Sequence, residues 1–190
     1  MRTRLSTEQR RAQLLAIGAE LFAARPYDEV WIEEVAEIAQ VSRGLLYHYF
    51  PAKRDFFLEV LRVERDRLLE LSAPDPELAP VDQLVAGLEV YLEYAATHPQ
   101  SYRVAHRTAL AADAETRAIV EVSIAAQYDR ILAGLATLMP VDDVTRFAVR
   151  GWLRYVPVVT LDWLDDPVIT RDELRDLCVR MLLAAVRLDL

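Results

Sequence analysis

The chain has 190 residues, of which 53% are hydrophobic, and it contains five glycines, nine prolines and one cysteine. This length allows a sizeable core, the composition is typical of a mostly α-helical fold, and the single cysteine, Cys178, excludes an internal disulfide and a cysteine-based metal cluster. There is no secretory signal pattern and no apolar stretch long enough to span a bilayer, so we expect a cytoplasmic protein.

The net charge of −8 is unevenly distributed along the chain. Residues 1–55 contain eight basic and eight acidic residues, whereas residues 56–190 contain 14 basic and 22 acidic residues. DNA repels an acidic surface, so only the N-terminal segment suits contact with DNA. We expect the acidic remainder to face away from it.

The first predicted helix runs from a capping box to a proline. Ser6 and Gln9 lie three residues apart, so the Ser6 hydroxyl can accept from the amide of Gln9 while the Gln9 side chain reaches back. Apolar residues then recur at helical spacing up to about Ala24, and Pro26 ends the segment. The charged residues of this N-terminal arm are Arg2, Arg4, Glu8, Arg10 and Arg11, so the arm is basic.

Two short helices are predicted next, at about 32–39 and 42–50, with a turn at 40–41 between them. Ser42 is a natural N-cap for the second helix, and Pro51 interrupts the chain after it. Two short helices joined by a tight turn are typical of a helix-turn-helix, whose second helix can enter the major groove of DNA.

The second of these helices has a buried side and an outer side. Leu46 and Phe50 lie four residues apart and are predicted to face the core. The outer side then carries Arg43, Gly44, Leu45, Tyr47, His48 and Tyr49. Exposed aromatic side chains are costly, and contact of their polar tips with DNA phosphates would explain them; the alternative is a solvated face with aromatic packing. Arg43 has the donors to read guanine, and Lys53, the only lysine, can bind a phosphate at the start of the next helix.

The rest of the chain is predicted to form six further helices. A proline-rich loop at 72–80 follows the first of them, and Thr170 with Glu173 forms a second capping box. The predicted helices span about 52–71, 81–97, 100–111, 113–138, 142–164 and 171–188. No segment alternates with the period of a strand. We therefore expect an all-α fold, with a helix-turn-helix domain at 1–52 and a larger helical domain at 53–190.

Over the segment Val41-Ser-Arg-Gly-Leu-Leu-Tyr-His-Tyr-Phe-Pro-Ala-Lys53 the sequence resembles the TetR family of bacterial regulators, and the match extends over about residues 8–60. The resemblance implies a three-helix DNA-binding domain, a six-helix ligand-binding and dimerisation domain, and repression that a small molecule relieves. Matched by position, it implies that Arg43, Gly44, Leu45, Tyr47, His48 and Tyr49 lie in the groove, with Lys53 on phosphate. The predicted DNA-binding set also includes Ser42, the N-cap of the same helix.

Three departures from the family pattern concern the first helix of the pair and the turn. Trp31 stands where the family often has a threonine or serine cap. Glu33 and Glu34 suit the positive end of the helix dipole but would repel a phosphate. Gln40 replaces a common glycine and would be strained if the turn needs a positive φ.

Polar-tipped aromatic residues and histidines in the C-terminal half are candidates for an effector pocket. They are Tyr91, Tyr94, His98, Tyr102, His106, Tyr128, Trp152 and Tyr155. A buried tyrosine or tryptophan needs a polar partner, so several on adjacent helices indicate an amphipathic pocket; the alternative is that each is a core residue. Pro157 is predicted to kink its helix nearby, which could open a cavity. The acidity of this half favours a cationic or neutral ligand.

The last two predicted helices carry more apolar surface than one subunit can hide. The predicted dimer interface consists of Phe147, Val156, Val159, Trp163, Leu174, Leu177, Cys178, Met181, Leu182 and Ala185. Two such helix pairs from two chains would form a four-helix interface, and ordinary packing within one chain is the alternative. Cys178 is most simply a small buried apolar residue.

Enzyme chemistry has no support in the sequence, because it lacks a glycine-rich phosphate loop, Gly-x-Ser-x-Gly and His-Glu-x-x-His, and we expect no cofactor and no metal site. The interpretation is a homodimeric regulator, a repressor that a small-molecule effector releases from a palindromic double-stranded DNA operator. Two alternatives remain open: a dimeric DNA-binding regulator without a small ligand, and an all-α small-molecule-binding protein whose DNA-binding head does not function.

Overall fold

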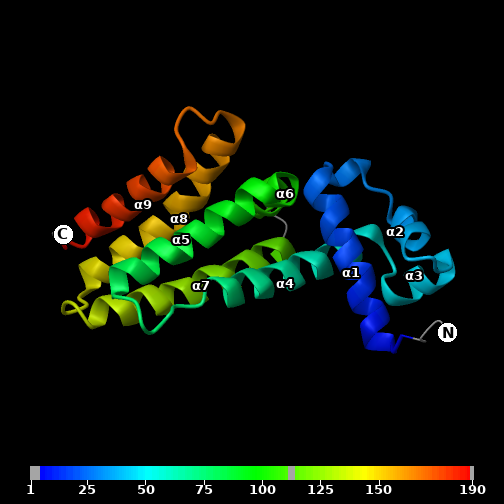
Figure 1. The fold of residues 1–190 in the computed structure, drawn as a ribbon, viewed down its shortest axis with the longest axis horizontal. Coiled ribbons are helices and arrows are strands. Elements are labelled where there is room, and N and C mark those ends of the chain that lie inside the picture. The colour runs from blue at the N-terminus through cyan, green and yellow to red at the C-terminus, as the bar shows by residue number, and fades with distance from the viewer. Residues whose placement is uncertain (1–4, 111–113, 189–190) are drawn as a thin grey trace. The chain divides into compact units, whose positions relative to one another are not determined.

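The computed structural model describes residues 5–110 and 114–188, and all regular structure among these residues is helical (Figure 1). The helices are α1 (Thr7–Ala24), the 3-10 helix η1 (Tyr27–Glu29), α2 (Ile32–Ile38), α3 (Arg43–Tyr49), α4 (Lys53–Leu71), α5 (Pro80–Thr97), α6 (Pro99–Leu110), α7 (Ala114–Ala136), α8 (Asp143–Asp165) and α9 (Arg171–Ala185). The all-α prediction is confirmed. None of the described helices combines the length and hydropathy that a membrane-spanning segment requires.

Two compact units make up the chain. Unit 1 joins Met1–Asp66 to His98–Ile119, and unit 2 joins Arg67–Thr97 to Val120–Leu190. Helix α6 therefore belongs to the same packing unit as the helix-turn-helix, although it lies far from it in sequence. The division at residue 52 into a DNA-binding and a ligand-binding domain concerns function, and it stays a prediction.

The core of unit 1 is built around aromatic side chains from α1, the C-cap of α3, and α4. Phe22, Phe50 and Phe56 are almost completely buried, and the rings of Phe50 and Phe56 meet edge to face with centroids 4.8 Å apart. Helix α6 packs against α1 and η1, and its residues Val104 and Ala105 lie against this core. Residues near the middle of the chain thus support the helices that position α3.

Helix ends in unit 1 agree closely with the sequence. The Ser6 capping box is present, with both reciprocal bonds to Gln9, and the Ser42 hydroxyl accepts from the amide of Leu45 at 3.2 Å. Trp31 precedes α2 without a side-chain cap bond. Gln40 has a φ of 54°, so the turn does need a positive φ, and a residue with a side chain is strained there as expected. The turn geometry is therefore kept without glycine.

Unit 2 is organised around α5, α8 and α9, which lie side by side (Figure 1). Its core contains Leu92, Val149, Cys178 and Leu182, all fully buried. The indole Nε1 of Trp152 donates to the carbonyl oxygen of Cys178 at 2.8 Å, which ties α8 to α9. Helix α8 runs continuously through Pro157 from Asp143 to Asp165.

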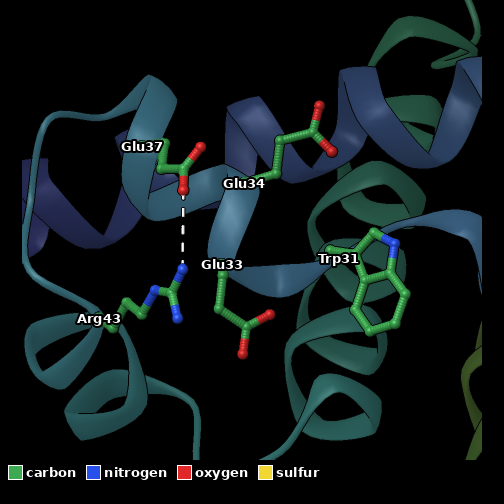
Figure 2. A pocket seen from close by; sticks show the side chains of 5 residues that line it. All are labelled: Trp31, Glu33, Glu34, Glu37 and Arg43. Atoms are coloured by element: carbon green, nitrogen blue, oxygen red, sulfur yellow. Dashed lines mark ion pairs between the residues drawn. The ribbon is translucent and has the colours of Figure 1, made fainter.

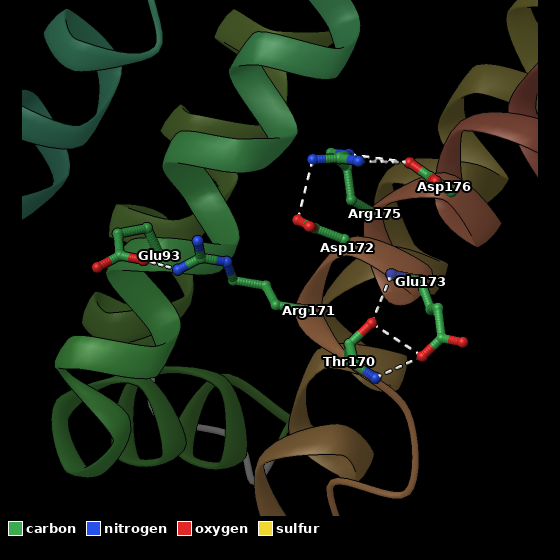
Figure 3. Close-up of polar contacts among 7 residues, drawn as sticks. All are labelled: Glu93, Thr170, Arg171, Asp172, Glu173, Arg175 and Asp176. Atoms are coloured by element: carbon green, nitrogen blue, oxygen red, sulfur yellow. Dashed lines mark hydrogen bonds and ion pairs between the residues drawn. The ribbon is translucent and has the colours of Figure 1, made fainter.

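Polar contacts at the start of α9 cap this helix, and one ion pair links it to its neighbour α5. Thr170 and Glu173 form the predicted capping box, because each side chain bonds the backbone amide of the other residue. Arg171 makes an ion pair with Glu93 of α5 (Figure 3). The second predicted helix start is therefore confirmed together with a tertiary contact that the sequence did not reveal.

The predicted helices all exist within the described residues, with ends that shift by three residues or fewer. The 3-10 helix η1 was not predicted, since it lies in the segment after Pro26 that has no helical periodicity. The predicted helix ends at 111 and 113, and Arg2 and Arg4 of the arm, lie outside the described residues.

Candidate nucleic-acid interface

Helix α3 has the predicted buried and outer sides. Leu46 and Phe50 are 0% and 1% exposed, so they anchor the helix in the core of unit 1. Of the predicted DNA-binding residues, the exposed ones are Ser42, Arg43, Gly44, Tyr47 and His48, and the half-buried ones are Leu45, Tyr49 and Lys53. The outer side of α3 therefore presents one guanidinium, one imidazole and one phenol to solvent.

Arg43 extends from the start of α3 toward α2. Its Nη2 lies 3.8 Å from Oε1 of Glu37, and both side chains are about 70% exposed (Figure 2). An ion pair this exposed is weak, because solvent screens the charges and two long side chains lose freedom. Arg43 can therefore exchange Glu37 for an acceptor on another molecule at little cost.

Tyr47, one helical turn after Arg43, is 39% exposed, and its hydroxyl donates to Oε1 of Glu33 at 2.5 Å. This bond is the leading cause of a lowered pKa at Glu33 and of a raised pKa at Tyr47. At neutral pH Glu33 is ionised and Tyr47 keeps its proton, so the phenol is the donor. The sequence placed Glu33 in the first turn of α2 but did not reveal this contact.

Lys53 begins α4 beside an aromatic cluster. Its Nζ lies 4.4 Å from the ring centroid of Tyr27, and that ring stacks on Phe22 with centroids 5.9 Å apart. A cation above an aromatic face is attracted to the ring and keeps other donors free. Lys53 is therefore held at the first turn of α4 with an ammonium that can still reach an anion.

Tyr49 is divided between the core and the surface. Its ring packs against the unit 1 core, and its hydroxyl donates to the carbonyl oxygen of Thr7 at 3.5 Å. The neighbouring His48 ring lies edge to face with the Tyr49 ring, with centroids 5.8 Å apart. Tyr49 thus supports the position of His48, and its own contact with a groove stays a prediction.

Helix α2 adds an acidic side to this surface. A shallow depression is lined by Trp31, Glu33, Glu34, Glu37 and Arg43 (Figure 2). Glu33 and Glu34 point to different sides of α2, and Glu34 pairs with Arg25 of unit 1 at 2.7 Å. The spacing of four between Glu33 and Glu37 is the sequence signal that places both on one helix face, next to α3.

The predicted effector residues are distributed over both units. In unit 1, Tyr102 is 2% exposed, its ring centroid lies 4.3 Å from that of His106, and burial lowers the pKa of His106 to about 4. His98 also lies in unit 1, with its Nε2 4.0 Å from Oε2 of the buried Glu64. Unit 2 holds Tyr91, Tyr94, Tyr128, Trp152 and Tyr155.

Trp152 lies in the core of unit 2, which is the alternative that the sequence left open for it. Its side chain is 7% exposed and belongs to the core between α8 and α9, where its only donor already bonds a carbonyl. It therefore packs as a core residue in this structure, and its predicted contact with an effector stays a prediction. Tyr128 is half-buried and lies under the guanidinium of Arg150, 5.3 Å from its ring centroid.

The predicted dimer residues separate by exposure. Four of them are buried in the core of unit 2 and are at most 4% exposed: Val156, Leu174, Cys178 and Leu182. For these four, packing within one chain already accounts for the burial, and their predicted interface role stays a prediction. Val159, Trp163 and Leu177 are half-buried, whereas Phe147, Met181 and Ala185 are exposed. The sequence predicted that α8 and α9 carry more apolar surface than one subunit can bury. It did not predict which of these residues face the core and which face outward.

Comparison with known proteins identifies both parts of the chain. Residues 14–60 match the family model described as bacterial regulatory proteins, tetR family, and residues 80–185 match the model described as tetracyclin repressor-like, C-terminal domain. The second match alone covers more than half of the chain.

Curated relatives align over part of their length. The chain is 28% identical over 130 residues to the HTH-type transcriptional activator FasR of Mycolicibacterium smegmatis, covering 67% of this chain and 59% of FasR. It is 45% identical over 60 residues to the HTH-type transcriptional regulator LuxR of Vibrio harveyi, covering 32% of this chain and 29% of LuxR. The chain thus matches less than two thirds of either relative.

A solved structure matches nearly the whole fold. A tetR-family transcriptional regulator from Streptomyces coelicolor has a TM-score of 0.87 and 29% identity, covering 96% of this chain and 82% of that one. Both family models and this structure point to the same DNA-binding family. The chain therefore belongs to the TetR family of bacterial transcriptional regulators, which bind DNA through a helix-turn-helix and are not enzymes.

Proposed function

We propose that the protein is a homodimeric repressor that binds a palindromic operator and is released from it by a small-molecule effector. The observation that carries this proposal is the outer side of α3, where Arg43 and His48 are exposed above a fully buried Leu46. Lys53, at the start of the next helix, adds a phosphate-binding cation. This arrangement fits a recognition helix in the major groove, with base contacts from α3 and backbone contacts beside it.

Dimerisation is supported by apolar side chains on the outer side of α8 and α9. Val144 and Phe147 of α8 are 62% and 77% exposed, and Met181 of α9 is 42% exposed. Further along α8, Val158 is also exposed, and a Cβ added at Gly151 would meet no atom within 4 Å. A symmetric partner would cover this surface with the same surface of its own, giving four packed helices. The two recognition helices would then meet successive major grooves, about 34–36 Å or a multiple of that apart.

Release by an effector is supported by two polar aromatic residues of α6, the buried Tyr102 and the half-buried His106. Tyr102 and His106 lie in the same unit as the helix-turn-helix, so a ligand that displaces α6 changes the support of α1. Because the pKa of His106 is lowered to about 4, its imidazole is neutral at pH 7 and offers no positive charge to an anion. A neutral or cationic effector fits this environment and the acidic composition of the C-terminal half.

The test is selection of bound duplexes from a random DNA pool with the purified protein. The expected result is an inverted repeat whose half-sites are bound with an affinity that falls steeply as salt rises. A pool that stays random after repeated selection would overturn the DNA-binding assignment of α3 and favour the reading of a small-molecule-binding protein with a non-functional head.

A reporter placed behind the recovered site then decides the direction of regulation. Repression predicts lower expression with the protein and recovery when the effector is added, whereas activation, which the name of FasR specifies for that relative, predicts higher expression. If no compound from a chemically diverse library shifts the melting temperature or the operator affinity, the regulator without a small ligand is the better description.

A further inference from the structure

The hydroxyl proton of Tyr47 is already engaged within the protein. Tyr47 donates to Glu33 at 2.5 Å, a charge-assisted bond between a phenol and a carboxylate. The pKa of Glu33 is lowered and that of Tyr47 is raised by this same bond, which keeps the proton on the phenol. A tyrosine has one hydroxyl hydrogen, so the side of its oxygen that faces away from Glu33 presents only lone pairs.

This arrangement decides which groups of a duplex can bond Tyr47. Phosphate oxygens are acceptors, and they would meet the lone pairs of Tyr47 and the negative charge of Glu33. In the major groove the donors on base edges are the N6 amino group of adenine and the N4 amino group of cytosine. The Tyr47 oxygen, held by Glu33, can therefore accept a hydrogen bond from a base amino group, but it cannot donate one to a phosphate of the DNA backbone.

The scaffold holds Glu33 in this position. Ile32, Val35 and Ala36 of α2 are all buried in the unit 1 core, and α2 packs against α3, so the carboxylate projects from a fixed helix. When DNA excludes water from the surface, the bond to the carboxylate strengthens, because the local dielectric falls. If the hydroxyl turned toward a phosphate, the Glu33 carboxylate would lose its hydrogen-bond donor and would lie close to the negative phosphates.

We propose that Glu33 is a specificity-determining residue, which makes the Tyr47 hydroxyl an acceptor and so directs it to an adenine or cytosine amino group instead of a phosphate. This inference rests on the proposed function, in which α3 lies in the major groove. It replaces the expectation that the phenol contacts the DNA backbone, and it gives an acidic residue of α2 a role in reading sequence.

The experiment compares site selection and binding titrations of the full chain with those of three variants. Tyr47→Phe keeps the ring and removes the hydroxyl; the preference for adenine or cytosine at one position of each half-site should disappear, with an about fivefold loss of operator affinity. Its affinity for random-sequence DNA and its salt slope should stay unchanged, because no phosphate contact is lost.

Glu33→Ala frees the hydroxyl to donate, so the preference at that same position should change toward guanine or thymine, whose O6 and O4 atoms accept. Glu29→Ala removes an exposed acidic residue from η1 of the same unit, and it serves as the matched control for lost charge. This control should keep the base preference of the wild type at every position.

Two results would overturn the inference. One is a Tyr47→Phe variant that keeps every base preference but binds all DNA more weakly with a flatter salt slope, which would mark a phosphate contact. The other is a Glu33→Ala variant whose selected site equals that of the wild type. Failure of the proposed function has a different signature, since the wild-type protein would then select no palindrome at all.

Discussion

Arg43 and Lys53 are proposed to make two kinds of DNA contact, and a different measurement tests each of them. Arg43→Ala should relax the preference for one base pair in each half-site, because a guanidinium reads guanine through two acceptors. Binding-site selection with the variant checks this. If the preference is retained at every position, another side chain of α3 reads that base.

Lys53→Ala should weaken binding to every sequence and lower the slope of log affinity against log salt by about one, since one phosphate contact is lost. Titrations at several salt concentrations measure the slope. Lys53→Arg is the control that keeps the charge near the Tyr27 ring. An unchanged slope in the alanine variant would show that the ammonium does not contact the backbone.

His106 links the protonation of one side chain to the stability of the fold. Burial lowers its pKa from 6.5 to about 4, so between these values the unfolded chain binds a proton that the folded chain does not. The free energy of unfolding should therefore fall as pH drops from 6.5 toward 4, by up to about 1.4 kcal/mol per pH unit. Above pH 6.5 neither state binds this proton, so His106 causes no change of stability with pH there.

The measurement is urea unfolding across this pH range, with the wild type compared with His106→Gln. The glutamine variant keeps a polar side chain but cannot titrate, so its stability should depend less on pH. His48→Gln, on the exposed side of α3, is the control for loss of one histidine. Parallel curves for the wild type and His106→Gln would show that His106 is protonated equally in both states.

At the scale of the helices, α1 and α4 approach so closely that only glycine fits at position 18. A Cβ built there would lie 2.4 Å from Cζ of Phe56, which is fully buried. Gly18→Ala should therefore destabilise the protein by about 1–3 kcal/mol, although alanine is the better helix former. Denaturant unfolding measures the difference in free energy.

Gly87→Ala is the matched control, since Gly87 also lies inside a helix, α5, and its added Cβ meets no atom within 4 Å. It should leave stability unchanged or raise it by about 0.5–1 kcal/mol. A Gly18→Ala protein as stable as the wild type would mean that the Phe56 ring moves aside without cost.

The helices themselves were largely predictable, because capping residues, prolines and apolar spacing are local signals. Ser6, Ser42 and Thr170 each mark a helix start that the structure contains. The pairing of helices was not predictable. Val104 and Ala105 of α6 look like any apolar pair in the sequence, and only the fold brings them to the core of unit 1. The packing of α6 on α1 joins two helices that lie far apart in the sequence.

The candidate site was also predicted where local signals suffice, and it was missed where the packing of helices decides the contact. The periodicity of α3 correctly separated the buried Leu46 from the outer Arg43 and Tyr47. It did not show that Glu33 accepts a bond from Tyr47, because 14 residues and a turn separate them. Side-chain partners across a turn depend on how α2 and α3 pack, which no local pattern specifies.

For the whole molecule, the proposed dimer requires that the exposed side of α8 be covered by the partner subunit. Phe147 is 77% exposed, and an aromatic ring in water is unfavourable unless something covers it. Phe147→Asp places a charge where the two subunits would meet, and the pair of charges would be buried without partners. The variant should be monomeric in sedimentation at concentrations at which the wild type is dimeric.

The loss of dimerisation should carry over to DNA, because a palindrome binds two heads tightly only when they are joined. Operator affinity of Phe147→Asp should fall by about 100-fold, to roughly that of a single half-site. Leu71→Asp is the control: Leu71 is also an exposed apolar residue of unit 2, at the end of α4. A Phe147→Asp protein that stays dimeric would place the subunit interface on another surface, and the apolar side of α8 would then need a different explanation.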